Sequence, residues 1–283
     1  MASAVADLVA VALAEVGNVF NTNCMSYYNI SGKISSNAQG LDIDNRAFRY
    51  ADALFESMYF TNGKIQLIEE HWSRIQNSMS LLKMGLPSLP GHNDLEQATK
   101  DLMEVNNIKG AARIRLQVFR KSGGFYLPIH RDCDYLLEAQ SLENEDYILN
   151  KKGLKVGIAE NVKIAVSSFS QIKTTSKLEM VLGALEAEDK GWNDAILLNS
   201  AHHIAEATGS NVFILNDGQL FTPRIEDGAL NGIMRQHIIN IAGNQNMDCF
   251  QTFLTVEDLI NADEVFLTNA VRGIQWVEQF GDK

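Results

Sequence analysis

The stretch QIKTTSKLEMVLGALEAEDKGWNDAILLN, residues 171–199, places two lysines directly before an apolar segment with helical spacing. Its apolar side chains recur three and four residues apart: Leu178, Val181, Leu182 and Leu185. This spacing predicts a helix with one face packed on a core. Lys173 and Lys177 precede that helix, where the positive end of the helix dipole disfavours an ammonium group. The pair is therefore either two solvated lysines or includes a base whose amine is readily deprotonated, and the stretch alone leaves both open.

Length and composition are those of a soluble enzyme with a large core. The chain has 283 residues, of which 46% are hydrophobic, enough for one large domain or two of moderate size. Its net charge of -11 argues against nucleic acid or an anionic membrane as the main partner. Cys24, Cys133 and Cys249 lie far apart without a CxxC pair, so we expect reduced thiols in a cytoplasmic protein. The adjacent His202 and His203 would point to opposite faces of a strand, so we expect no metal site.

Residues 1–22 are predicted to form an N-terminal extension, as a short helix or a partly ordered segment. Their apolar run is short, contains Asp7 and Glu15, and has no lysine or arginine, which is unlike a secretory signal or a transit peptide. No other segment approaches the roughly 20 apolar residues of a membrane span. The sequence therefore predicts no membrane partner.

Two domains are expected from the order of the predicted elements. Strand-like segments come first, followed by helices over 69–85 and 92–107. The stretch KSGGFYLPIHRD, residues 121–132, has two glycines and a proline and is the predicted linker. We therefore expect a small α+β domain over 23–120 and a larger α+β domain over 133–283, with a cleft between them. The chain has no GxGxxG, P-loop, GxSxG or HExxH motif, which disfavours nicotinamide, ATP and serine-hydrolase chemistry.

Three further positions could carry chemistry. Glu206 is an acid in an otherwise apolar strand, just before the turn-forming Thr-Gly-Ser-Asn. Gly232 opens a predicted helix, whose first amides, from Ile233 and Met234, could bind a phosphate. Arg74 lies in the helical segment EEHWSRIQ. Each also has an ordinary interpretation: a surface acid, a glycine-started helix and a solvated arginine.

Seven blocks of sequence, taken in order, resemble the class IV family of pyridoxal-phosphate enzymes. They are RAFRYADALFESM (46–58), HWSRIQNS (71–78), KTTSKLEMVLGALEAEDKGWNDAILLN (173–199), IAEATGSNVFIL (204–215), LFTP (220–223), GALNGIMR (228–235) and EVFLTNAVRGIQWV (264–277). The family holds branched-chain aminotransferases, D-amino-acid aminotransferases and aminodeoxychorismate lyases. The resemblance runs from about residue 26 to the end of the chain, with Ala51 and Ala53 at two glycine positions of the family pattern. It implies the two-domain fold type IV, which is D-amino-acid aminotransferase-like, and a homodimer.

The resemblance implies a role for each candidate residue. Lys173, not Lys177, is the position of the Schiff-base lysine, which also acts as general base and lies in the larger domain. Glu206 is the acid at the pyridine nitrogen of pyridoxal 5'-phosphate. Arg74 and the amides of Ile233 and Met234 form the phosphate site, with Met234 where the family commonly has threonine. Lys177 is left without an assigned role.

The reaction is less well defined by the resemblance. Phe55 and the backbone amides of Ala270 and Val271 are the implied substrate-binding positions. We expect an aminotransferase acting on an amino acid, branched-chain or another aliphatic L-amino acid, and a 2-oxo acid, because this activity is the most widespread in the family. Gly123, Gly124 and the TNAVRG turn favour the alternative, an aminodeoxychorismate lyase releasing pyruvate and 4-aminobenzoate. A D-amino-acid aminotransferase is less favoured, because KSGGFYLP lacks its Arg-x-His carboxylate trap.

Overall fold

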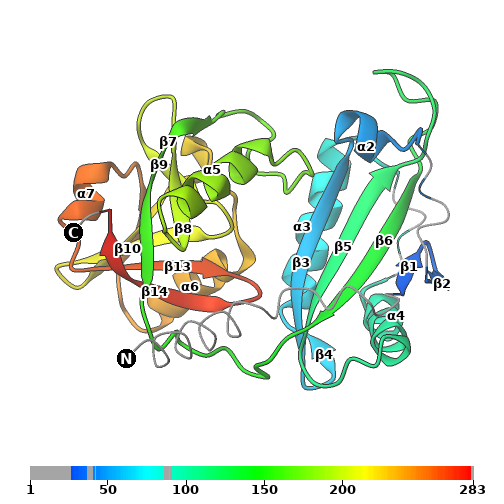
Figure 1. Cartoon of the computed structure of the whole chain (residues 1–283), viewed down its shortest axis with the longest axis horizontal. Helices are drawn as coiled ribbons and strands as arrows, with labels where there is room; N and C mark the ends of the chain where they lie inside the picture. The colour runs from blue at the N-terminus through cyan, green and yellow to red at the C-terminus, as the bar shows by residue number, and fades with distance from the viewer. Residues whose placement is uncertain (1–26, 37–40, 42, 86–88, 90, 282–283) are drawn as a thin grey trace, which may run out of the picture.

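The computed structural model describes residues 27–36, 41, 43–85, 89 and 91–281. Two sheets stand side by side, each with its own helices (Figure 1). Within the described residues, no helix is long and apolar enough to cross a membrane. The extension predicted for residues 1–22 lies outside the described residues, as does Cys24.

The first sheet has six strands in the order β2-β1-β6-β5-β3-β4, and all neighbouring strands are antiparallel. Its strands are β1 (Tyr28–Ile30), β2 (Lys33–Ser35), β3 (Ala53–Thr61), β4 (Lys64–Ile65), β5 (Ala112–Arg120) and β6 (Cys133–Ser141). Its helices are α2 (Arg46–Tyr50), α3 (Ile68–Leu81) and α4 (His92–Val105). Side chains along β5 point alternately to the two faces of the sheet. Ile114, Leu116 and Val118 join the core beneath α3 and α4, whereas Arg113 and Arg115 lie on the opposite face of β5, toward the second sheet.

The predicted linker at 121–132 is wrong. Strand β6 pairs with β5 from Ala112↔Ser141 to Arg120↔Cys133, so residues 121–132 join two neighbouring strands of one sheet. Gly123 and Gly124 have positive φ, and the loop turns back on itself through the Gly124↔Pro128 bridge. Glycine and proline mark a turn within a sheet as strongly as a linker, which explains the error. The chain leaves the first sheet after β6 and enters the second at β7, so the crossing segment is 142–153.

The second sheet has eight strands in the order β12-β11-β10-β13-β14-β7-β8-β9. They are β7 (Leu154–Ile164), β8 (Asp194–Asn199), β9 (Ile204–Ala207), β10 (Asn211–Asn216), β11 (Gln219–Pro223), β12 (Cys249–Thr252), β13 (Glu264–Asn269) and β14 (Gly273–Phe280). Its helices are α5 (Leu178–Asp189), η1 (Ile225–Asp227), α6 (Ile233–Asn244) and α7 (Val256–Ile260). The pairs β7–β8, β7–β14 and β11–β12 are parallel, and the other pairs are antiparallel.

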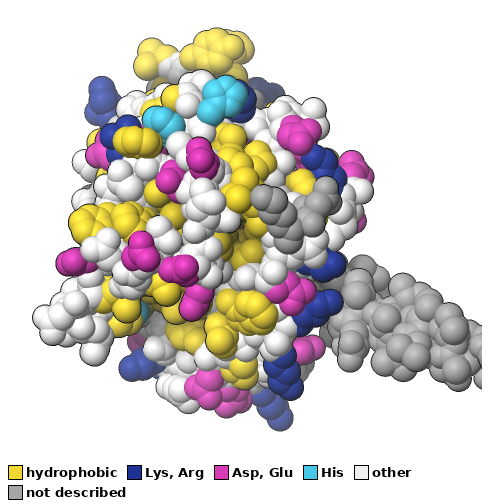
Figure 2. Space-filling view, turned by 90° about the vertical axis from the view of Figure 1, so that its left-hand side faces the viewer, with side chains coloured by type: hydrophobic (Ala, Val, Ile, Leu, Met, Phe, Trp, Pro, Cys, Tyr) yellow, Lys and Arg dark blue, Asp and Glu magenta, His cyan; other side chains and the backbone are white. Residues whose placement is uncertain are grey.

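Helix α5 forms where the sequence predicts it, but the predicted core-facing side is wrong. Its apolar residues lie in solvent, with exposed fractions of 66% for Leu178, 53% for Val181, 46% for Leu182 and 51% for Leu185. The buried face is instead Gly183, Glu186 and Ala187. A Cβ on Gly183 would lie 3.1 Å from Thr208 Cγ2, so the small residue allows the helix to approach the sheet closely. The space-filling view of the side of the molecule that carries the second sheet shows hydrophobic side chains exposed between charged ones (Figure 2).

Candidate active site

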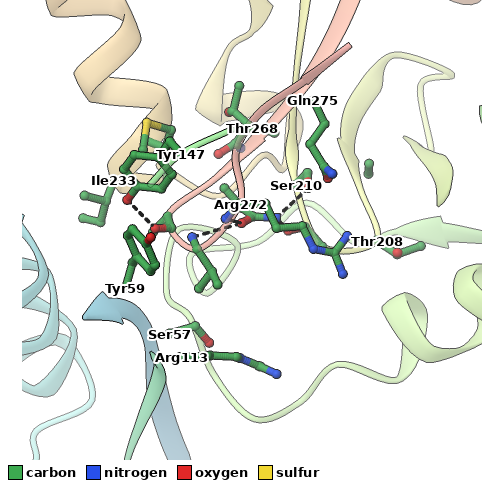
Figure 3. A pocket seen from close by; sticks show the side chains of 18 of the residues that line it. Ser57, Tyr59, Arg113, Tyr147, Thr208, Ser210, Ile233, Thr268, Arg272 and Gln275 are labelled. Carbon is green, nitrogen blue, oxygen red and sulfur yellow. Dashed lines mark hydrogen bonds between the residues drawn. The ribbon is translucent and has the colours of Figure 1, made fainter. Parts of the chain in front are cut away.

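A cavity of about 890 Å³ lies between the two sheets and receives side chains from both (Figure 3). All of the predicted site residues line it: Phe55, Arg74, Lys173, Glu206, Ile233, Met234, Ala270 and Val271. Lys177, which had no assigned role, lines it too. In the first sheet, alternation along the strand brings side chains to the cavity, because Phe55, Ser57 and Tyr59 on β3 share the face that lines it. Residues spread over more than two hundred positions therefore meet in one cavity.

Lys173 is held at the cavity by backbone pairing between its own segment and strand β3. Phe55 N donates to Lys173 O at 2.9 Å, and Thr175 N donates to Ala53 O at 3.1 Å. The Lys173 ammonium lies 4.6 Å from the centroid of the Phe55 ring. Burial, reinforced by the positive charge of Arg74, lowers the pKa of Lys173 from 10.5 to about 8. A sizeable fraction of this amine is therefore neutral near physiological pH and able to attack a carbonyl carbon.

Glu206 is a buried acid on strand β9 that lines the cavity. Its side chain is 7% exposed, and its Oε2 accepts a hydrogen bond from Leu230 N at 3.2 Å. Burial raises the pKa of Glu206, and the positive charge of Lys177 opposes that rise more than any other group does. The bond to Leu230 leaves Oε1 able to accept from a further donor. The interpretation of Glu206 as a surface acid is thereby excluded.

Arg74 is fixed in place by a buried acid that the sequence analysis missed. Its Nε donates to Glu56 Oε1 at 2.8 Å and its Nη2 to Glu56 Oε2 at 2.6 Å. His71 Nδ1 donates to the same Oε2 at 2.7 Å. Burial opposes ionisation of Glu56, but the charge of Arg74 and the hydrogen bonds outweigh it and lower its pKa to about 2. Two features of the sequence could have revealed this acid: Glu56 is a charged residue in an otherwise apolar strand, and His71 lies one helical turn before Arg74.

The start of helix α6 faces the cavity without a side-chain cap. Gly232 is the N-cap, and Ile233 and Met234 follow as the first two helical residues. A Cβ at Gly232 would overlap Asn211 Oδ1, so only glycine fits here without displacing that side chain. Because the first amides of a helix have no partners within it, this end can bind an anion.

The turn between β13 and β14 differs from what its predicted role requires. Val271 N donates to Asn269 Oδ1 at 3.0 Å, and Arg272 N donates to the same oxygen at 2.8 Å. Tyr147 Oη donates to Ala270 O at 2.8 Å. A substrate carboxylate could use the Val271 amide only by replacing the Asn269 oxygen. The carboxylate site predicted at this turn therefore stays a prediction.

Arginines on the cavity wall were also missed by the sequence analysis. Arg113 and Arg115 lie on the cavity face of β5. Figure 3 shows Arg113 on this side and Arg272 on the turn between β13 and β14. The Arg115 guanidinium carbon is 3.9 Å from the centroid of the Phe55 ring. The sequence ARIRLQ could have revealed the two β5 arginines, because its alternation of arginine and apolar residues places both arginines on one face of a strand. Glu143, Asp146 and Asp194 also line the cavity, but the arginines on β5 can pair with an anionic group of a bound molecule.

The cavity fits pyridoxal 5'-phosphate, the cofactor expected from the sequence. Lys173 can hold an aldehyde carbon, the buried Glu206 suits a protonated ring nitrogen, and the capless start of α6 suits a phosphate. Thr268 Oγ1 also lines the cavity, is buried, and has no hydrogen-bond partner among the described residues. A bound polar molecule would supply the missing partner.

Comparison with known proteins agrees with the cofactor and the family expected from the sequence. The family described as amino-transferase class IV matches residues 53–280. A Methanocaldococcus jannaschii protein that carries the name of a branched-chain-amino-acid aminotransferase is 26% identical over 226 residues, 80% of this chain and 77% of that protein. An aminodeoxychorismate lyase of Vibrio harveyi is 23% identical over 234 residues, 82% of this chain and 84% of the lyase.

A solved structure supports the fold. The branched-chain aminotransferase of Thermoproteus uzoniensis with norvaline superposes with a TM-score of 0.79 at 23% sequence identity. The match covers 90% of this chain and 87% of that one. The expected type IV fold, with its two sheets, is confirmed.

Proposed function

Because the chain belongs to the class IV aminotransferase family, whose members depend on pyridoxal 5'-phosphate, we propose that it transfers an amino group between an amino acid and a 2-oxo acid. The proposed donor is a branched-chain or another aliphatic L-amino acid. The observation that carries the proposal is the meeting of Lys173, whose pKa is lowered to about 8, with the buried Glu206 at one cavity. An amine that is readily deprotonated suits removal of a proton from the substrate Cα, and a buried acid suits a protonated ring nitrogen.

Each residue has one task in this proposal. The cofactor, when bound, supplies an electron sink for charge that develops at the substrate Cα. Lys173 Nζ would take the proton from the substrate Cα and deliver it to the aldehyde-derived carbon of the cofactor, so that the amino nitrogen stays behind when the 2-oxo acid leaves. Glu206 would keep a proton at the ring nitrogen. Arg74 and the amides of Ile233 and Met234 hold the phosphate. Phe55, Ala270 and Val271 stay the proposed substrate-side residues.

The second candidate is the aminodeoxychorismate lyase reaction, which releases pyruvate and 4-aminobenzoate. It is favoured by the cationic wall, because Arg113 and Arg115 suit a substrate with an additional carboxylate better than an aliphatic side chain. A D-amino-acid aminotransferase is the least favoured, because the loop KSGGFYLP carries no Arg-x-His pair.

The test is a product assay with a panel of substrates. Purified protein with cofactor is incubated with single L- or D-amino acids and 2-oxoglutarate, and glutamate is measured. We expect glutamate from aliphatic L-amino acids and none from a Lys173→Ala control. Aminodeoxychorismate is tested in parallel without an acceptor, and pyruvate is measured. If no amino acid of either hand yields glutamate while aminodeoxychorismate yields pyruvate, the lyase replaces the aminotransferase.

We also propose that the chain is a homodimer. The apolar side of α5, formed by Leu178, Val181, Leu182 and Leu185, is unusually exposed for a helix and is suited to burial against a second copy. Sedimentation should give twice the chain mass, and Leu182→Glu should shift it to the single-chain mass. The matched control is Glu188→Gln, at an exposed acid of the same helix. A single-chain mass for the unaltered protein would contradict the proposal. The cytoplasmic location stays a prediction from the cysteine spacing.

A further inference from the structure

Two arginines from different helices meet at Asn231, in the turn that leads into α6. Arg74 on α3 donates from Nη1 to the backbone oxygen of Asn231 at 3.0 Å. Arg235 on α6 donates from Nη1 to the side-chain Oδ1 of Asn231 at 3.2 Å. Asn231 therefore links the helix that carries Arg74 to the helix whose first amides face the cavity.

Arg235 is a buried cation whose hydrogen-bond acceptors are all neutral oxygens. It is 1% exposed, and no ion pair forms on it within the described residues. Besides Asn231, its acceptors are the neutral oxygens Pro223 O at 3.0 Å and Gln251 Oε1 at 2.9 Å, while its Nε has no partner. Glu226 acts on Arg235 from a distance, but a buried charge that is hydrogen-bonded only to neutral oxygens is stabilised further by an additional anion within its field. The start of its own helix is the anion site described above.

The same turn is tied to the acid of the site. Leu230 N donates to Glu206 Oε2 at 3.2 Å, and Asn211 Nδ2 donates to Leu230 O at 2.8 Å. Gly232 follows Asn231 directly and starts α6. Any shift of Asn231 therefore moves the amides of Ile233 and Met234 relative to Arg74.

We propose that Asn231 is a positioning residue for the cofactor phosphate. Its backbone oxygen fixes Arg74, and its side-chain oxygen fixes Arg235, so that the two guanidinium groups and the first α6 amides keep one arrangement. Arg235, which is not among the residues that line the cavity, adds positive charge close to the start of α6. This inference rests on the bound cofactor and not on which reaction the enzyme performs.

The test compares two cofactor forms that differ only by the phosphate. Cofactor-free protein is titrated with pyridoxal 5'-phosphate and with pyridoxal, and binding is followed by tryptophan fluorescence. Asn231→Ala keeps the backbone oxygen and removes Oδ1. We expect about a tenfold weaker affinity for pyridoxal 5'-phosphate, the usual effect of losing one hydrogen bond to a charged group, and an unchanged affinity for pyridoxal.

A second variant separates the hydrogen bond that positions Arg235 from the positive charge of Arg235. Asn231→Asp keeps an acceptor for Arg235 and adds a negative charge that offsets the guanidinium, so we expect weaker binding of pyridoxal 5'-phosphate again, with pyridoxal unchanged. The matched control is Asn199→Ala, a buried asparagine outside the cavity whose Nδ2 donates to Asp227 O at 3.0 Å. It should lower the melting temperature without changing the ratio of the two affinities.

Two outcomes would overturn the proposal. One is an Asn231→Ala protein that binds both forms as tightly as the unaltered protein does. The other is an equal loss for both forms, which would mean a general loss of packing. Neither outcome bears on the choice between aminotransferase and lyase, because the titration uses no substrate.

Discussion

Replacing Glu56 with glutamine should destabilise the fold by about 3 kcal/mol at neutral pH. The pKa of Glu56 is lowered from 4.5 to about 2, and each pH unit corresponds to about 1.4 kcal/mol. Its side chain is only 3% exposed, so solvent screens the interaction little. The glutamine keeps the size of the side chain but leaves Arg74 and His71 without an anion, which is the unfavourable case for a buried pair.

The pH dependence gives the prediction its sign. Because the folded-state pKa is below the unfolded one, the stabilisation is fully present above about pH 4.5 and is lost as the pH falls toward about 2. Glutamine does not titrate, so the variant lacks this contribution at every pH. The difference in unfolding free energy between the two proteins should therefore be largest at pH 7 and narrow in acid.

The assay is urea unfolding of the cofactor-free proteins, followed by tryptophan fluorescence at neutral and acidic pH. The matched control is Glu138→Gln on the same sheet, where the side chain is 38% exposed and lies 3.6 Å from Arg115 Nε. This exposed pair should contribute less than about 1 kcal/mol. A Glu56→Gln protein within about 1 kcal/mol of the unaltered protein at pH 7, or a difference that does not narrow in acid, would refute the reasoning.

Three further changes address the base and the acid of the cavity. Lys173→Ala should keep weak cofactor binding and lose turnover. In the unaltered protein, borohydride should attach the cofactor to the peptide that contains Lys173. Attachment to Lys177 would show that the assignment of the Schiff-base lysine is wrong. Lys177→Gln removes a positive charge that lowers the pKa of Lys173, so the pKa of Lys173 should rise in this variant. The pH profile of cofactor uptake by the cofactor-free protein, which should be half-maximal near pH 8 in the unaltered protein, should then move to higher pH. An unmoved profile would mean that solvent screens the charge of Lys177 from Lys173. Glu206→Gln should fold and bind cofactor but turn over roughly a hundredfold more slowly, a barrier change of about 3 kcal/mol, and near-normal turnover would remove Glu206 from the chemistry.

Much of the cavity could be predicted from the sequence because its parts are local. The lysine ahead of α5, the acid on β9 and the glycine-started α6 each lie within a short stretch whose own periodicity forms the element. Their order along the chain then resembled one family, and all of these residues line one cavity. The roles of these residues stay predictions until the variants above are measured.

The tertiary structure alone decided how these parts are supported. The pairing of Glu56 with Arg74 depends on how α3 packs against β3, and the loop at 121–132 is a connection within one sheet only because β5 and β6 pair in register. The periodicity of the sequence predicted the apolar side of α5 but not which side of the helix is buried, because Gly183 lets the opposite side approach the sheet. Periodicity is set by neighbours a few residues away, whereas register, close approach and the partner of a buried charge depend on residues that only folding brings together.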